Sequence, residues 1–199
     1  MRPSRGTAAL LIGVCAVGGL AGCTRDSVEP TPEPTVSSSP TATPSPTPTP
    51  TTPPEAIAPE RPAAIDEVSV AGAEAAATYF LQLYPYAYAT GDLSKWNELS
   101  DPECAFCQSV IRNVQEQVAA SHSSSGSAIA ILEVSAWEIN VGRYGATVTA
   151  NEGPSKEYDE AGEVVSERTE SEKHVLTYAL RHDGSNWRVL ELDVETVES

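Results

Sequence analysis

The spacing of hydrophobic residues along the chain changes after residue 127. Between residues 69 and 121, apolar side chains recur every three or four residues, which is typical of α-helices with one buried face. From residue 128 onward they alternate with polar side chains, which is typical of β-strands. This order predicts an α+β domain with three N-terminal helices packed on one face of an antiparallel sheet of about four strands.

The first predicted helix lies within residues 69–92. Ser69 is its predicted N-cap, and Gly91 is the glycine expected just after its last turn. Pro85 lies inside the pattern, and we expect it to kink or break the helix because proline lacks the backbone N–H. One apolar face is expected to contain Ala73, Ala76, Ala77, Phe80, Tyr84, Ala87 and Tyr88.

Two shorter helices follow in the pattern. Asp92 is the predicted cap of a helix in "LSKWNEL", residues 93–99. The stretch "SDPEC" predicts the start of a third helix, with Pro102 in its first turn, that runs to about Ser121. The polar "SHSSSGS" after it reads as a loop.

The second half of the chain predicts strands within residues 128–141, 144–153, 157–167 and 174–197. "DEAG" and "HDGSN" are turn sequences that predict hairpins. In the last two strands, one buried face is expected to hold Leu176, Tyr178 and Leu180, and another Leu190, Leu192 and Val194.

The N-terminus has the layout of an export signal, with Arg2 and Arg5 before an apolar run that ends near Gly19. The run is too short to span a bilayer, which needs roughly 20 apolar residues. The following "LAGC" resembles the lipobox of bacterial lipoproteins. That resemblance implies that residues 1–22 are a signal peptide and that Cys23 becomes the lipid-bearing first residue. The alternative is a cleaved signal without lipid.

Residues 23–66 are dominated by proline, threonine and serine. Such a segment has little to bury and cannot offset the entropy of folding, so we predict a disordered stalk. A globular domain is then expected over residues 67–199. Anchored through Cys23, the chain would sit on the outer face of the cytoplasmic membrane, with the domain held up to about 100 Å away.

The net charge of the chain limits the classes of partner that we expect. The chain has 28 acidic against 12 basic residues and a net charge of −16. Loss of Arg2 and Arg5 with the signal would make this −18. Nucleic acid requires basic patches and is therefore not an expected partner. An envelope protein or a small ligand remains.

Cys104 and Cys107 would be the two thiols left in an exported domain, where disulfides form. A zinc site needs more ligands than one C-x-x-C supplies. His122, His174 and His182 are scattered and have no ligand spacing, so no metal and no cofactor are predicted.

A redox pair needs an exposed thiolate, and acidic neighbours Asp101 and Glu103 disfavour one. The helical stripe of Cys104, Cys107, Ile111, Val114 and Val118 turns both sulfurs toward the core. The favoured interpretation is a structural disulfide, with Cys104 at the capping edge of the helix so that the bond can close.

The stretch "YFLQLYPYAYATGDLSKWNELSDPECAFCQSVI" and the later "DEAGEVV" resemble an uncharacterised family of actinobacterial lipoproteins, a domain of unknown function. The long first helix ending in "YATGD" and the closing strand "NWRVLEL" resemble the nuclear transport factor two-like, or cystatin-like, cone. The resemblance implies fold and location and no activity.

Cone folds often bind ligands between helices and sheet, so Tyr84, Tyr88 and Trp96 are candidate residues for a pocket lip. Packing in the core is the alternative for each of them. No catalytic constellation is present in the spacing. Three hypotheses result: a non-catalytic ectodomain that binds a ligand or partner, a small pocket enzyme, and a thiol redox lipoprotein. An inward His/Asp pair in an open pocket would favour the second.

Overall fold

The computed structural model describes residues 56–197. The predicted signal peptide, Cys23 and most of the predicted stalk lie outside these residues. The helical elements are η1 (Ala63–Asp66), α1 (Val70–Thr90), α2 (Ser94–Leu99) and α3 (Ala105–Ala119). The strands are β1 (Ser123–Gly126), β2 (Ile129–Asn140), β3 (Arg143–Glu152), β4 (Ser155–Tyr158), β5 (Val164–Arg168), β6 (Glu172–His182) and β7 (Trp187–Val197).

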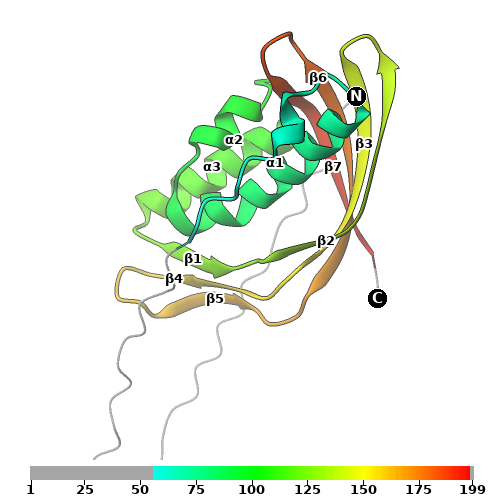
Figure 1. Ribbon diagram of the computed structural model, residues 1–199. Coiled ribbons are helices and arrows are strands. Elements are labelled where there is room, and N and C mark those ends of the chain that lie inside the picture. The colour runs from blue at the N-terminus through cyan, green and yellow to red at the C-terminus, as the bar shows by residue number, and fades with distance from the viewer. Residues whose placement is uncertain (1–55, 198–199) are drawn as a thin grey trace, which may run out of the picture. The chain divides into compact units, whose positions relative to one another are not determined.

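The predicted α+β class is confirmed, with a second sheet that the pattern does not reveal. Four strands form an antiparallel sheet in the order β2-β3-β6-β7, and three form a smaller one in the order β1-β4-β5. The helices lie on the concave side of the curved larger sheet, and the smaller sheet closes the base of the cone (Figure 1).

The smaller sheet continues the larger one after a bend. Each of its strands is separated by only a few residues from a strand of the larger sheet, and the neighbours keep the same order. At the bend, Ser127 N–H donates to the Pro154 carbonyl at 2.8 Å, and Gly153 N–H donates to the Ala128 carbonyl at 2.9 Å. Gly126 has φ +91°, and a Cβ there would overlap the carbonyl of Pro154, so the bend requires glycine.

Helix α1 begins and ends as its sequence predicts. Ser69 Oγ accepts a hydrogen bond from Gly72 N–H at 3.1 Å, and Gly91 closes the helix in the left-handed conformation with φ +74°. The expected break at Pro85 is wrong, because the helix is continuous from Val70 to Thr90. Its buried positions spread over most of its circumference, and that packing offsets the roughly 3 kcal/mol that an internal proline costs.

The expected stripe on α3 is partly wrong. Its buried helical residues are Cys107, Val110, Val114 and Gln117, whereas Val118 is 54% exposed. Gln117 tolerates burial because both ends of its amide are bonded: Nε2 donates to the Tyr88 carbonyl, and Oε1 accepts from Ser124 Oγ, each at 2.7 Å.

The predicted face of β7 also changes along the strand. The β6–β7 pairing shifts between Ala179 and Leu180, which pair with Glu191 and Val189, so Leu190 is the extra residue of a β-bulge. Trp187 and Val189 are buried before the bulge and Leu192 after it. The expectation of one continuous face through Leu190 is therefore wrong.

Ordered structure begins before residue 67, the predicted start of the domain. Ile65, in η1, is buried in the core, and its carbonyl accepts a hydrogen bond from the Trp187 indole at 2.9 Å. The end of the predicted stalk is thus part of the fold. Within residues 56–197, no helix combines the length and the hydropathy needed to cross a membrane.

Candidate functional site: a cavity between the helices and the sheet

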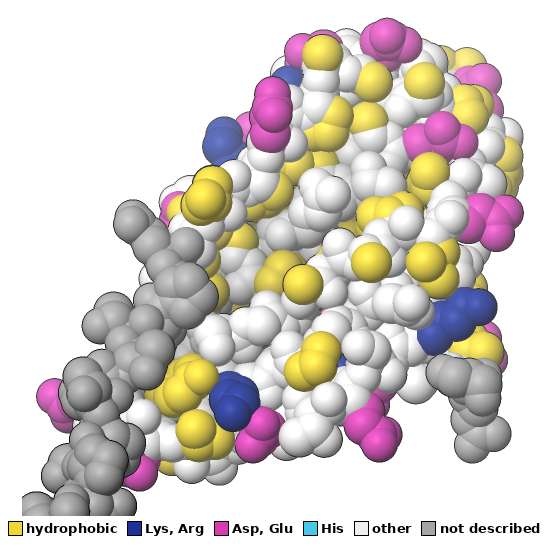
Figure 2. Space-filling view, turned by 60° about the horizontal axis from the view of Figure 1, so that its bottom comes forward, with side chains coloured by type: hydrophobic (Ala, Val, Ile, Leu, Met, Phe, Trp, Pro, Cys, Tyr) yellow, Lys and Arg dark blue, Asp and Glu magenta, His cyan; other side chains and the backbone are white. Residues whose placement is uncertain are grey.

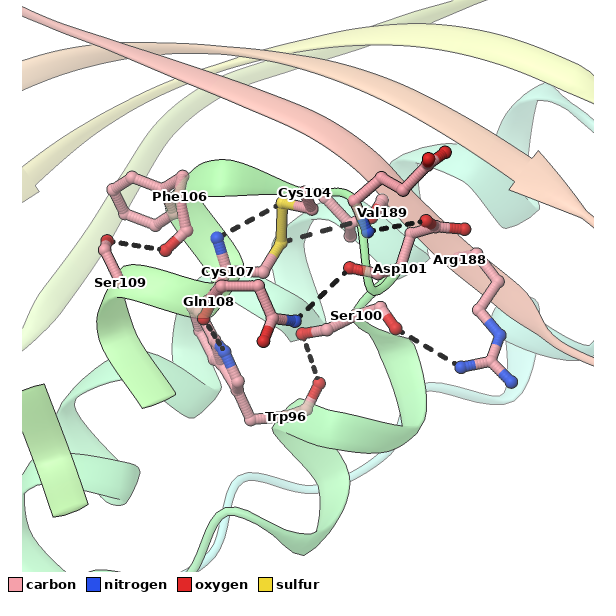
Figure 3. The surroundings of a disulfide bond; sticks show 11 residues. Trp96, Ser100, Asp101, Cys104, Phe106, Cys107, Gln108, Ser109, Arg188 and Val189 are labelled. Atoms are coloured by element: carbon pink, nitrogen blue, oxygen red, sulfur yellow. Dashed lines mark hydrogen bonds between the residues drawn. A yellow bond between two sulfur atoms is a disulfide. The ribbon is translucent and has the colours of Figure 1, made fainter. Parts of the chain in front are cut away.

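Cys104 and Cys107 form a disulfide at the start of α3 (Figure 3). Cys104 is the N-cap residue with extended backbone, and its Sγ accepts from Cys107 N–H at 3.2 Å. The two Cα atoms are 5.3 Å apart, within the usual range for a disulfide. Their exposed fractions are 1% and 0%, so neither sulfur is open to a redox partner.

The disulfide lies in a hydrogen-bonded junction between α2, α3 and β7 (Figure 3). Trp96 Nε1 donates to the Cys107 carbonyl at 3.2 Å. Asp101 N–H donates to the Val189 carbonyl at 3.0 Å, and Arg188 Nη1 donates to the Ser100 carbonyl at 3.3 Å. These bonds tie the start of α3 to the sheet and leave no space for chemistry at the cysteines.

Trp96 belongs to the core and not to a pocket lip. It is 2% exposed and stacks on Phe80 with a centroid distance of 4.0 Å. The sequence-based expectation for this residue is therefore wrong. Its indole N–H has the Cys107 carbonyl as a partner, which allows the whole side chain to be buried.

A cavity of about 200 Å³ lies between α1, α3 and the inner face of the larger sheet. Most of its wall is apolar, and two polar side chains, Glu152 and His174, stand at one end. All four strands of the sheet contribute to it. The lining residues are Leu81, Tyr84, Phe106, Ile129, Ala150, Glu152, His174, Leu176 and Val194.

A polar cleft of about 420 Å³ lies next to this cavity, between α1, α3 and the smaller sheet. Tyr84 and Glu152 line both spaces, and Tyr88 lines the cleft. The rings of Tyr84 and Tyr88 are 4.9 Å apart and tilted. Burial raises the pKa of the Tyr84 phenol above its usual value, so the group is neutral at physiological pH. Tyr84 thus stands where the apolar and polar spaces meet.

Four ionisable side chains meet at the bend between the two sheets. Arg168 Nη2 lies 2.6 Å from Glu152 Oε1, and its Nη1 lies 3.7 Å from Glu172 Oε2. His174 Nε2 lies 3.4 Å from Glu152 Oε2 and 3.8 Å from Glu172 Oε2. The other ring nitrogen, Nδ1, is 3.2 Å from Thr196 Oγ1. An imidazole and a carboxylate therefore point into the end of the cavity.

Sequence reasoning misses this cluster, which we call the bend cluster (Glu152, Arg168, Glu172 and His174). The residues are brought together by the register of β3 and β6, which pairs Ala150 with His174 and Glu152 with Glu172. Alternation along β6 places His174 on the same face as Leu176, and that is the one signal that predicts an inward histidine. No residue near His174 in the sequence indicates that β3, with Glu152, is the strand that pairs with β6.

Acidic side chains are unevenly distributed over one face of the domain. On the face shown in Figure 2, acidic side chains lie mainly around the rim, whereas the centre is covered by hydrophobic and uncharged polar groups. Rim carboxylates disfavour the approach of acidic partners.

Residues 47–193 match DUF6318, a family of unknown function, and the chain belongs to that family. No curated protein has significant similarity to the sequence. The match gives the family of residues 47–193, and it gives no activity because the function of the family is unknown.

Solved structures extend the comparison to the fold. The intermembrane space region of the chloroplast protein ARC6 has a TM-score of 0.50 at 13% identity, covering 65% of this chain and 98% of that one. An uncharacterized protein with a cystatin-like fold from Caulobacter vibrioides has a TM-score of 0.41 at 15% identity, covering 62% and 88%. A putative dehydratase from the NTF2-like family from Streptomyces avermitilis has a TM-score of 0.41 at 14% identity, covering 62% of this chain and 95% of that one. Likeness at this level concerns the fold alone.

Proposed function

We propose that this domain binds a small molecule in the cavity between α1 and the larger sheet. The observation that carries the proposal is the cavity itself, which has apolar walls and ends at Glu152 and His174. Protein cores are close-packed, so an apolar space of about 200 Å³ that ends in converging polar groups supports a site for a ligand smaller than those that fill pockets of about 300–1,000 Å³.

The dimensions suggest the class of ligand. An apolar cavity of about 150 Å³ holds benzene in another protein, so about 200 Å³ suits one aromatic ring or a short branched chain. A polar group on the ligand would face Glu152 and His174, and a longer polar tail could extend past Tyr84 into the cleft. We expect a neutral or cationic ligand, because an anion would meet Glu152.

Binding of the simplest such probe, indole, tests the proposal. Isothermal titration calorimetry should detect saturable binding to the domain. Ala150→Leu adds three carbon atoms inside the cavity and should weaken the affinity about tenfold or more, a loss of roughly 1.4 kcal/mol. Ala130→Leu is the matched control, since Ala130 lies on the neighbouring strand and is exposed.

Two results would oppose the proposal. The first is the absence of saturable binding to the wild-type domain by indole and by its single-ring analogues. The second is an equal effect of Ala150→Leu and Ala130→Leu, which would place the probe elsewhere. Circular dichroism of both variants shows whether each keeps its fold.

The site is proposed to operate at the cell envelope, with Cys23 as the membrane anchor. The support is the signal-like N-terminus and the "LAGC" sequence. Mass spectrometry of the N-terminal peptide should find a diacylglyceryl group on Cys23. Cys23→Ala should release the protein from membranes, and an unmodified Cys23 in the membrane-bound protein would contradict the anchor.

A small pocket enzyme is the second candidate, and one observation favours it. If His174 Nδ1 donates its proton to Thr196 Oγ1, the opposite nitrogen is a free base aimed toward the cavity. Such a base beside Glu152 suits proton abstraction from a bound molecule. A ligand that is recovered chemically unchanged after prolonged incubation would exclude this alternative for that ligand.

A further inference from the structure

The ring nitrogen Nε2 of His174 is buried at the bend cluster and has no hydrogen-bond partner. It lies between two carboxylates, 3.4 Å from Glu152 Oε2 and 3.8 Å from Glu172 Oε2. One donor atom from each of these three residues lies within 4.8 Å of the others. Arg168 contacts both carboxylates and offsets part of their charge. When the ring proton is on Nδ1, the Nε2 lone pair still faces two carboxylate oxygens, and a cation between these three atoms would remove their repulsion.

The distances fit a metal ion with mixed nitrogen and oxygen ligands. Zinc binds histidine nitrogen at about 2.0–2.1 Å and carboxylate oxygen at about 2.0–2.2 Å, so two ligands of a tetrahedral ion lie about 3.4 Å apart. The two His174–carboxylate distances, 3.4 and 3.8 Å, are at or close to this value. One nitrogen and two oxygens leave a fourth position open for water or a ligand.

Neighbouring groups orient the ligand atoms. Thr196 Oγ1 lies 3.2 Å from His174 Nδ1, the kind of contact that fixes the ring of a metal-bound histidine. Arg168 Nη2 binds Glu152 through Oε1, which leaves Oε2 turned toward His174. Arg168 is itself held in place, because its Nη1 donates to the Glu170 carbonyl at 3.1 Å.

We propose that Glu152, Glu172 and His174 bind a divalent transition-metal ion of the Zn²⁺ type at the end of the cavity. The site would hold the bend between the two sheets together and place a Lewis acid where a ligand's polar group would lie. This inference goes beyond the proposed ligand binding, because the cavity can take an apolar probe with or without a metal. The two tests can therefore fail separately.

Calorimetric titration with Zn²⁺ tests the site. The protein is the mature chain with Cys23→Ser and the Cys104–Cys107 disulfide intact, so that no thiol competes for the metal. One equivalent should bind, and the visible spectrum of bound Co²⁺ should report a nitrogen and oxygen ligand set. His174→Ala removes a direct ligand and should weaken Zn²⁺ binding by at least the 10–100-fold that loss of an outer-shell partner costs.

The chain offers a matched control. His122 Nδ1 lies 2.8 Å from Glu157 Oε1, a second histidine–glutamate pair that lacks the third ligand. His122→Ala should leave Zn²⁺ affinity unchanged. Glu172→Gln should also weaken binding about tenfold or more. The Glu172 side chain is 45% exposed, so this variant keeps the test valid if His174→Ala does not fold.

Absence of saturable Zn²⁺ binding would overturn the proposal, as would equal affinity in the wild type and Glu172→Gln.

Discussion

Two adjacent regions of the cone are packed differently: the region around the disulfide, which we call the filled end, and the region around His174, which we call the open end. They meet where the rings of Tyr84 and Phe106, which line the cavity, lie 6.4 and 6.5 Å from the Trp96 ring. Around the disulfide, Trp96, Phe80 and the two cysteines fill the space between α2, α3 and β7, and each buried polar atom described there has a partner. Around His174, a cavity remains open, and a buried ring nitrogen has none. The filled end is close-packed, whereas at the open end the Nε2 atom of His174 is buried beside a cavity without a hydrogen-bond partner.

This difference supports the proposed division between a structural region and a ligand-binding region, which the sequence motifs do not indicate. The C-x-x-C spacing suggests thiol chemistry, yet it belongs to the filled end and caps a helix. The open end has no recognisable motif, and its groups come from β3, β5 and β6. Unpartnered polar groups beside a cavity are a better indication of a binding site here than residue spacing.

The largest effect should come from removing the centre of the filled end. Trp96→Ala deletes a side chain that is 2% exposed and removes its stacking on Phe80, leaving a large void. We expect the free energy of unfolding to fall by about 3–5 kcal/mol, measured by urea denaturation. Trp137→Ala is the control, because Trp137 is 46% exposed; a loss as large as that of Trp96→Ala would mean that the filled end is not the main core.

A smaller loss is expected from the disulfide. Cys104→Ala with Cys107→Ala removes a crosslink that closes a loop of only four residues, so the free energy of unfolding should fall by about 2 kcal/mol. In a chain that begins after Cys23, thiol titration of the unfolded, unreduced protein should find no free thiol. Two titratable thiols would contradict the structural disulfide.

The smallest effect is expected from a buried hydroxyl on β6. Tyr178 is buried on the inner face of β6, and its hydroxyl has no hydrogen-bond partner among the described residues. Burial also raises the pKa of this phenol, which keeps the group neutral. Tyr178→Phe should leave the free energy of unfolding unchanged or raise it by about 1 kcal/mol, because it removes an unpaired polar group. A loss above 1 kcal/mol in urea denaturation would mean that the hydroxyl has an unseen partner.

Much of the fold follows from local signals. Ser69, Gly91 and the hairpin turns act within a few residues, so the sequence predicts them and the structure confirms them. The break at Pro85 fails because packing around α1 outweighs a local preference. Strand β1 is missed because its sequence, Ser-Ser-Ser-Gly, has no hydrophobic alternation and is held by pairing with β4.

The candidate site is harder to predict because it depends on register and on distant pairing. The bulge at Leu190 shifts the buried face of β7 and brings Val189 into the core. Glu152 and His174 are 22 residues apart and meet only through the β3–β6 pairing. Tyr84, Tyr88 and Trp96 are expected at a pocket lip because the resemblance to cone folds implies a ligand site between helices and sheet. Tyr84 and Tyr88 line the cleft, whereas Trp96 is in the core.

The claim that function lies at the open end can be tested by NMR titration of the ¹⁵N-labelled domain with indole. The account predicts saturable shifts at Leu81, Ile129, Ala150 and Leu176, which line the cavity, and no change at Leu99 or Val189, which are buried outside it. Saturable shifts centred on Val189 would contradict it. So would an unchanged spectrum at the solubility limit of indole.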